Sequence, residues 1–99
     1  MELLKIEIII SNTFLQDLIQ KLEKVGVHGY TAIEIFKGKG IKKGEQLSEG
    51  LLPTTRNSLV FTVSTAEITQ KVIENIQPYL DDRGGLIITS RVIYASGLS

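Results

Sequence analysis

A segment rich in glycine and lysine divides this chain of 99 residues and limits the folds that it can adopt. From Lys37 to Asn57 the sequence shows no hydrophobic period, and its glycines and Pro53 disfavour regular structure. A connection of this length is uncommon in a compact small domain and is usually functional or disordered. Because a chain this short makes one domain, the two flanking stretches must fold together.

The stretch before this segment alternates between strand and helix signals. Residues 3–10 are rich in isoleucine and alternate between apolar and polar positions, which predicts a strand. Thr13 followed by Gln16 resembles a capping box, and apolar residues then recur at helical spacing until a glycine stop. We therefore expect a helix from Phe14 to Val25 and a second strand from Tyr30 to Phe36.

The stretch after the segment repeats this layout without repeating the sequence. Alternation over residues 58–63 predicts a third strand, and Ser64 opens a second capping box ahead of an amphipathic helix. Pro78 lacks a backbone N–H and is expected to end or kink that helix. A turn at residues 82–85 and a fourth strand from Leu86 to Tyr94 complete the chain.

The order strand, helix, strand, loop, strand, helix, strand is the βαββαβ pattern of a ferredoxin-like α+β sandwich. We expect an antiparallel sheet with both helices on one face, in a single domain over residues 1–99 with a flexible loop at about 38–57. The outer strands are apolar on both sides, as at Ile9 and Ile10 or Ile87 and Ile88. An apolar second face in so small a chain predicts packing against other subunits.

Composition excludes several classes of function. The 11 basic and 11 acidic residues give a net charge of zero, which argues against bulk binding to nucleic acid. The chain has no cysteine, so disulfides and thiolate metal sites are excluded, and its one histidine, His28, is expected in an exposed turn. Without a signal peptide or an apolar run of membrane-spanning length, a cytoplasmic location is expected.

Several basic residues gather in the segment from Lys37 to Asn57, where they could contact a ligand. Glycines leave backbone N–H groups open to close approach, and lysines supply charge, so the segment suits a phosphate-bearing ligand. The alternative is a solvated charged loop. No full Walker pattern is present, which disfavours a P-loop enzyme. The basic residues are Lys37, Lys39, Lys42 and Lys43.

The chain resembles the PII-like signalling proteins over almost its whole length. The resemblance is carried by Gly26-Val27-His28-Gly29-Tyr30-Thr31, by Lys37-Gly38-Lys39-Gly40 with Lys43-Gly44, and by Arg91-Val92-Ile93. The pattern looks closest to SbtB, the PII-like partner of a cyanobacterial bicarbonate transporter, and to carboxysome-associated PII-like proteins. The resemblance implies a cytoplasmic, non-enzymatic homotrimer whose long T-loop acts on a partner protein. Membrane association would come only through a transporter partner.

The resemblance also implies adenine nucleotides as effectors, bound in clefts between subunits, with no obligatory cofactor or metal. Thr31 would offer its hydroxyl there, Gly29 and Tyr30 would shape the wall, and Arg91 would contact ligand or form an intersubunit ion pair. The loop base would present open amides and positive charge, and the turn before the last strand would face it. These further residues are Lys37, Gly38, Lys39, Gly40, Lys42, Gly84 and Gly85.

Departures from the nitrogen-regulatory PII pattern reduce the set of nucleotides that we expect this chain to bind. Two phosphate-gripping arginines are replaced by Tyr94, expected to pack in the sheet, and Ser96. The turn lysine falls near Gly85, and a loop glutamine that helps hold Mg-ATP with 2-oxoglutarate aligns with Lys42. We therefore expect AMP, ADP or cyclic AMP in preference to Mg-ATP. The inorganic-carbon role implied by SbtB stays an expectation.

Two other functions are compatible with a ferredoxin-like fold. A CutA-like metal-tolerance protein shares the trimeric ferredoxin-like architecture, but the single histidine and absent cysteines count against copper binding. An acylphosphatase-like enzyme needs an arginine between the first strand and helix, where this chain has Ser11-Asn12-Thr13.

Overall fold

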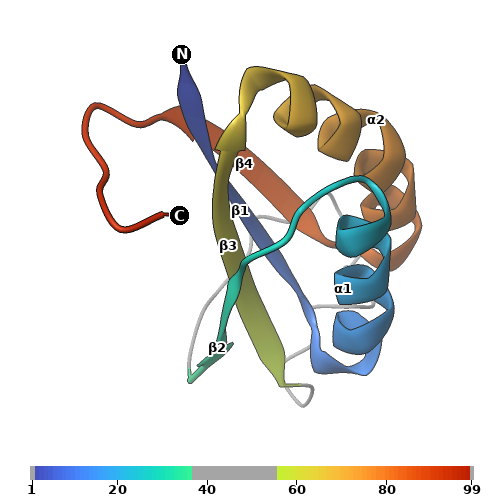
Figure 1. The fold of residues 1–99 in the computed structure, drawn as a ribbon. Helices are drawn as coiled ribbons and strands as arrows, with labels where there is room; N and C mark the ends of the chain where they lie inside the picture. The colour runs from blue at the N-terminus through green and yellow to red at the C-terminus, as the bar shows by residue number, and fades with distance from the viewer. Residues whose placement is uncertain (1, 37–55, 99) are drawn as a thin grey trace.

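Four antiparallel strands and two helices form the folded part of the chain in a computed structural model that describes residues 2–36 and 56–98. The strands run in the spatial order β2-β3-β1-β4, and both helices cover one face of the sheet (Figure 1). This confirms the predicted ferredoxin-like sandwich. The elements are β1 (Leu3–Ser11), a 3₁₀ turn (Asn12–Phe14), α1 (Leu15–Lys24), β2 (Thr31–Ile35), β3 (Asn57–Thr65), α2 (Ala66–Arg83) and β4 (Leu86–Arg91).

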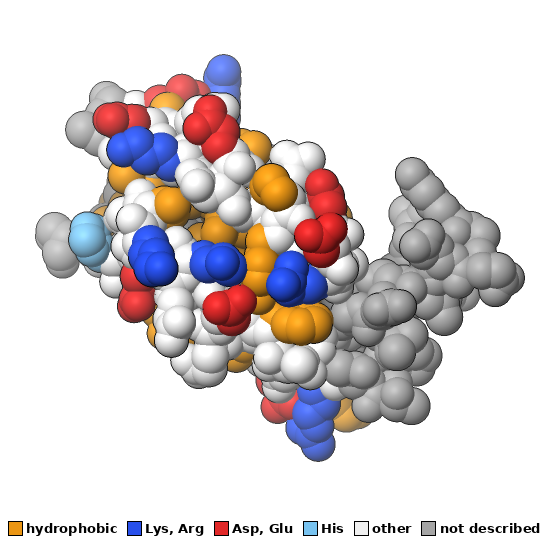
Figure 2. Space-filling model, turned by 90° about the vertical axis from the view of Figure 1, so that its right-hand side faces the viewer, with side chains coloured by type: hydrophobic (Ala, Val, Ile, Leu, Met, Phe, Trp, Pro, Cys, Tyr) orange, Lys and Arg blue, Asp and Glu red, His pale blue; other side chains and the backbone are white. Residues whose placement is uncertain are grey.

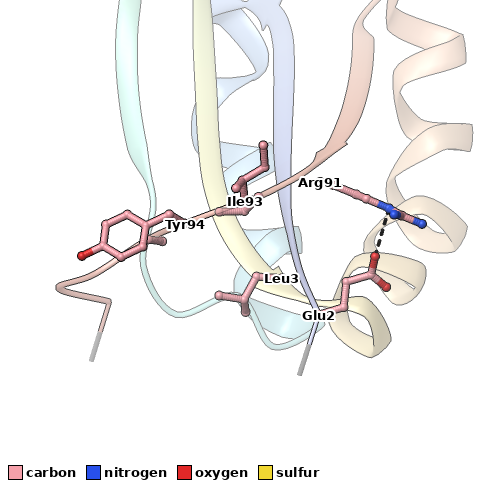
Figure 3. Close-up of a pocket in the computed structure, with 7 residues that line it drawn as sticks. Glu2, Leu3, Arg91, Ile93 and Tyr94 are labelled. Atoms are coloured by element: carbon pink, nitrogen blue, oxygen red, sulfur yellow. Dashed lines mark ion pairs between the residues drawn. The ribbon is translucent and has the colours of Figure 1, made fainter.

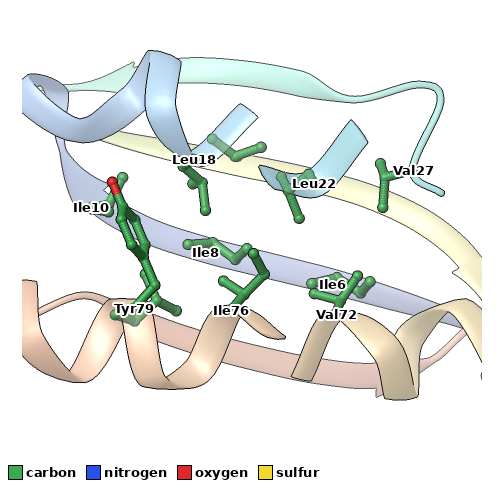
Figure 4. Close-up of a cluster of buried hydrophobic side chains, with 11 residues drawn as sticks. Ile6, Ile8, Ile10, Leu18, Leu22, Val27, Val72, Ile76 and Tyr79 are labelled. Atoms are coloured by element: carbon green, nitrogen blue, oxygen red, sulfur yellow. The ribbon is translucent and has the colours of Figure 1, made fainter. Parts of the chain in front are cut away.

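The core lies between the helices and one face of the sheet. Alternation in β1 turns Ile6, Ile8 and Ile10 toward the helices, and all three are fully buried. They meet apolar side chains of α1 from one side and of α2 from the other (Figure 4). The other members of this cluster are Leu18, Leu22, Val27, Val60, Val72, Ile76, Tyr79 and Leu80.

The opposite face of the sheet, which we call the open face, is also largely apolar and carries no helix (Figure 1). The register places Ile9 between Leu59 of β3 and Leu86 of β4, with Ile33 of β2 beyond Leu59. The segment that follows β4 also curls on this side of the sheet (Figure 1). The prediction of a sheet apolar on both faces is therefore confirmed, but the strand of Ile9 and Ile10, predicted as an outer one, is the inner strand β1.

Both predicted capping boxes were wrong, because the residues that cap the helical turns are different ones. The first helical turn is capped by Ser11, whose hydroxyl accepts from the Thr13 amide at 3.2 Å, and α1 itself has no side-chain cap. Thr65 caps α2 by accepting from the Ile68 amide at 3.2 Å, because β3 continues through Ser64.

Each helix is followed by a glycine, whereas the proline of α2 lies inside that helix. Gly26 and Gly84 follow α1 and α2 with positive φ values of 111° and 74°, as expected of C-terminal glycines. The prediction that Pro78 would end the second helix was wrong, since α2 continues to Arg83, and the kink proposed as the other outcome stays a prediction. Pro78 is exposed, so water can reach the carbonyl that loses its helical partner there.

The two edge strands are shorter than predicted, and the inner strand β3 is longer. β2 spans Thr31–Ile35 and β4 ends at Arg91 instead of Tyr94. β3 begins at Asn57, which the sequence placed in the loop, and the predicted turn at 82–85 is reduced to its glycines because α2 includes its first two residues. Pairing explains the difference, since β3 lies between two partners whereas β2 and β4 are edges.

Candidate functional site

The first group of predicted site residues lies where the chain enters the edge strand β2. Thr31 opens β2 opposite Phe61, and Gly29 precedes it with its carbonyl accepting a hydrogen bond from the Thr62 hydroxyl. All three predicted residues are exposed, and Tyr30 retains 41% of its accessible surface. The backbone is therefore anchored while the Thr31 side chain stays available to a ligand.

The second group, Gly84 and Gly85, lies in the turn between α2 and β4. Gly84 takes the left-handed conformation that ends α2, and the Gly85 amide donates to the Leu80 carbonyl at 3.0 Å. A Cβ on Gly85 would lie 2.6 Å from Leu80 Cδ2 and 3.1 Å from the Ile9 carbonyl oxygen. Both glycines are thus required by the fold, whatever they contact in addition.

The third group surrounds Arg91 at the far end of β4. Arg91 Nε lies 3.2 Å from Glu2 Oε2, and its side chain remains 84% exposed. The two side chains face each other, and Tyr94 points to the other side of the segment (Figure 3). A surface hollow of about 290 Å³ lies here, lined by Glu2, Leu3, Arg91, Val92, Ile93, Tyr94 and Ala95.

Two residues of this hollow were missed or misplaced by the sequence interpretation. Tyr94 was expected to pack in the sheet, but it lies beyond β4 and is 82% exposed. Glu2 belongs to no motif of the sequence, although a carboxylate that approaches an arginine changes what anion that arginine can hold. Only the pairing of β1 with β4 brings Glu2 to Arg91, so no sequence spacing could have found it.

These three groups do not converge within one chain. The register connects Thr31, Phe61, Glu7 and Ile88 in one row across the sheet, so β2 and β4 are three strand spacings apart, about 14 Å. Gly85 lies near Ile9, toward the opposite end of β4 from Arg91. The remaining predicted residues, Lys37, Gly38, Lys39, Gly40 and Lys42, lie outside the residues that the structure describes.

The helical face carries a cluster of basic and aromatic side chains that serves the fold. The Arg83 guanidinium lies 3.9 Å from the Tyr79 ring centroid and 5.5 Å from that of Phe14, and Lys21 lies 5.0 Å from Tyr79. Basic side chains alternate with apolar surface over this face (Figure 2). These contacts join α1 to α2 and fix the α2 terminus.

Tyr79 is buried within this cluster. Burial, and then the neighbouring Asp17 carboxylate, raise the pKa of the Tyr79 hydroxyl to about 12. We assign the cluster to helix packing because it lies on the face opposite the open sheet.

Comparison with known proteins identifies the family of this chain. The model of the family described as nitrogen regulatory protein P-II matches residues 3–96, nearly the whole sequence. The chain belongs to the nitrogen regulatory protein P-II family. A comparison with curated protein sequences gave no significant match.

Solved structures of P-II-like proteins share the fold at low sequence identity. Apo CPII from Thiomonas intermedia K12, a nitrogen regulatory PII-like protein, has a TM-score of 0.75 at 20% identity, with 93% of this chain and 90% of CPII covered. CPII bound to ADP, AMP and acetate gives 0.76 at 22%, covering 92% and 86%. Bacillus subtilis GlnK gives 0.65 at 19%, covering 94% and 87%.

Two of the predicted site residues carry groups that bind anions or hydroxyls in proteins generally. Arg91 is a permanent cation that can form paired hydrogen bonds to a phosphate, and Thr31 can donate or accept. Within residues 2–36 and 56–98, no group of three or more histidine, aspartate or glutamate side chains is placed to hold a metal ion. None of the helices described is long and apolar enough to span a membrane.

Proposed function

We propose that this P-II protein is a regulator that binds adenine nucleotides in clefts between neighbouring copies of a homotrimer. AMP, ADP or cyclic AMP are the preferred ligands in this proposal, ahead of Mg-ATP. The observation that carries it is the family match over residues 3–96. That match also favours the P-II reading over the CutA-like alternative considered from the sequence.

The ligands of related structures support the choice of effector. CPII has been solved bound to ADP with AMP, and bound to ADP with bicarbonate. GlnK of Bacillus subtilis has been solved in complex with ATP. The present chain has Tyr94 and Ser96 where the nitrogen-regulatory pattern has arginines, so it offers less positive charge to a triphosphate. A ligand with one or two phosphates suits it better.

The arrangement of the candidate residues supports a site shared between copies. Thr31 lies on the β2 edge, whereas Gly85 and Arg91 lie along the β4 edge, and one chain cannot bring both edges to one ligand. Two adjacent copies can place the β2 edge of one beside the β4 edge of the other. Such a cleft would bring the Thr31 hydroxyl of one copy beside the β4 edge of the next, where the glycine turn and Arg91 lie at opposite ends of the strand.

The regulated partner is the second part of the proposal. The segment at about 38–57 would contact a target protein, and the nucleotide at its base would change that contact. The resemblance to SbtB suggests a membrane transporter for bicarbonate or another small solute. The cytoplasmic location expected from the sequence remains a prediction.

The test is a thermal-shift series with AMP, ADP, ATP, cyclic AMP and 2-oxoglutarate, with the oligomeric mass measured on the same sample. A ligand that binds only the folded state raises the melting temperature as it saturates the site. We expect a trimer stabilised by AMP or ADP more than by Mg-ATP. Thr31→Val and Arg91→Gln should each reduce that shift, and His28→Gln, in the exposed turn, is the matched control.

Two results would reject the proposal. A trimer that no adenine nucleotide stabilises at millimolar concentration would remove the nucleotide-sensing role. A trimer stabilised only by copper would instead support the CutA-like alternative.

A further inference from the structure

The connection from α1 to β2, residues 25–30, is tied to the fold unevenly along its length. The Val27 amide donates to the Leu22 carbonyl at 3.0 Å, which holds the first half of the connection against α1. Among the described residues, no backbone–backbone hydrogen bond outside helices and strands reaches residues 28–30, which are all exposed. The stretch that leads into Thr31 therefore needs another support.

A side chain of β3 supplies this support. The Thr62 hydroxyl donates to the Gly29 carbonyl, and this is the one side-chain hydrogen bond that reaches residues 28–30 from the part of the chain that the structure describes. The pairing of β2 with β3 ends at Thr31 and Phe61, so Thr62 lies one position beyond the last pair. Its hydroxyl thus continues the contact between the two strands where their ladder stops.

The Thr62 side chain is fixed by its own surroundings. Thr62 lies on the covered face, opposite Ile6 of β1, and keeps 8% of its accessible surface. A buried hydroxyl needs a hydrogen-bond partner, and the Gly29 carbonyl provides it. Because a β-branched side chain has few rotamers, the donor is in place before any ligand arrives.

Gly29 is the residue of the connection that most needs to be held. It is absent from the glycines with positive φ, and a Cβ on it would meet no atom within 4 Å, so neither the turn nor the packing requires glycine there. A glycine loses more conformational freedom on ordering than any other residue. Without the hydrogen bond, a ligand would have to order this segment when it binds, and its affinity would fall.

We propose that Thr62 is a positioning residue of the nucleotide site, whose hydroxyl holds Gly29 so that Tyr30 and Thr31 keep their binding geometry in the ligand-free chain. This inference rests on the proposed function. Thr62 acts through the Gly29 carbonyl and has no contact with the ligand, because its side chain is buried on the covered face. Holding a binding segment in advance raises affinity, since less entropy is lost on binding.

The test separates the hydroxyl of Thr62 from its methyl group. Thr62→Val keeps the shape of the side chain and removes the donor, whereas Thr62→Ser keeps the donor and removes the methyl group. We expect Thr62→Val to weaken the binding of AMP and ADP about ten-fold and to speed amide hydrogen exchange in residues 28–31. Thr62→Ser should leave the dissociation constants within about three-fold of the original, although it lowers the melting temperature through the lost core contact.

Two measurements on the full chain are needed. Isothermal titration with AMP, ADP, ATP and cyclic AMP measures binding, and mass spectrometry of hydrogen exchange in the ligand-free protein measures the order of residues 28–31. Thr69→Val is the matched control, because Thr69 is 2% exposed and its hydroxyl oxygen has no hydrogen-bond partner among the described residues. It removes the same group from the core and should change neither measurement.

The outcomes separate this inference from the proposed function. If the unmodified protein binds a nucleotide and Thr62→Val weakens that binding by less than about two-fold, the inference is overturned and the proposed function stands. Equal losses of affinity in Thr62→Val and in either Thr62→Ser or Thr69→Val would also overturn it, because core packing would then be the cause. An unmodified protein that binds none of the four nucleotides would reject the proposed function and this inference with it.

Discussion

The two faces of the sheet carry similar apolar residues, but only one of them is buried within the single chain. On the covered face Ile8 lies against both helices and is 1% exposed, whereas Ile88 on the open face keeps 47% of its surface. Hydrophobic residues alone therefore do not tell which face closes within the chain. What differs is that the two helices, each apolar along one side, both lie over the same face.

Because only one face is covered within the chain, the two faces contribute to different stabilities, one to that of the single chain and the other to that of its assembly. The covered face contributes to folding in dilute solution, because its apolar area leaves water as soon as the chain folds. The open face can contribute only when another molecule covers it. Substitutions on the two faces should therefore differ in their dependence on protein concentration.

The largest effect is expected from adjacent isoleucines on opposite faces. Ile8→Ala should lower the unfolding free energy by about 2–5 kcal/mol at any protein concentration, because it opens a cavity in the core. Ile9→Ala should cost much less in the dissociated chain. Denaturant unfolding of both variants at low concentration checks this, and equal losses would show that the open face is closed within one chain.

A smaller loss is expected from the glycine turn that joins α2 to β4. Gly85→Ala should cost about 1–3 kcal/mol, because the new methyl group would crowd Leu80 and the Ile9 carbonyl. Gly29→Ala is the matched control, since a Cβ there meets no atom within 4 Å. Thermal unfolding of the two variants distinguishes them. A neutral Gly85→Ala would mean that the turn is free to shift and serves the ligand alone.

The basic and aromatic cluster around Tyr79 on the helical face should make the protein less stable at alkaline pH. The pKa of Tyr79 is raised from 10.0 to about 12, so the folded chain holds this proton more tightly than the unfolded chain. The resulting stability is fully present below pH 10 and is lost as the pH rises toward 12, by about 1–2 kcal/mol. Unfolding measured from pH 9 to 11.5 should show this decline, and Tyr79→Phe should remove that part of it.

The smallest effect on the single chain is expected on the open face. Ile88→Ser should change the unfolding free energy of the dissociated chain by less than about 1 kcal/mol, because the side chain is already half exposed. The same substitution should weaken the assembly, with Ile88→Val as the conservative control. Concentration-dependent melting curves measure both. An assembly indifferent to Ile88→Ser would place the contact between copies elsewhere.

The secondary structure could be predicted from the sequence where local rules decide it. Alternation in residues 3–10 and helical spacing after Phe14 depend only on near neighbours, and both elements were found. Gly26 was identified as the end of the first helix for the same reason, since glycine adopts positive φ at low cost, whereas Gly84 was predicted only as part of a turn. The family resemblance, confirmed by the match over residues 3–96, depended on short glycine-rich motifs.

Errors occurred where strand pairing overrode a local signal. Ser64 satisfies the rule for a helix cap, but pairing with Leu4 keeps it in β3 and moves the cap to Thr65. Tyr94 continues an apolar run, but the contact of the chain with β1 ends at the hydrogen bond from the Val92 amide to the Leu3 carbonyl, so the Tyr94 side chain stays exposed. The role of Glu2 beside Arg91 depends on the same pairing.

By itself the sequence determined the order of the elements, the glycine at which the first helix ends and the family to which the chain belongs. Only the tertiary structure decided which apolar face is covered, and that Thr31 and Arg91 lie on opposite edges of the sheet. The physical reason is that periodicity and glycine conformation act over a few residues. Which strands become edges depends on pairings between residues far apart in the chain, such as Ile9 with Leu59 and Leu86.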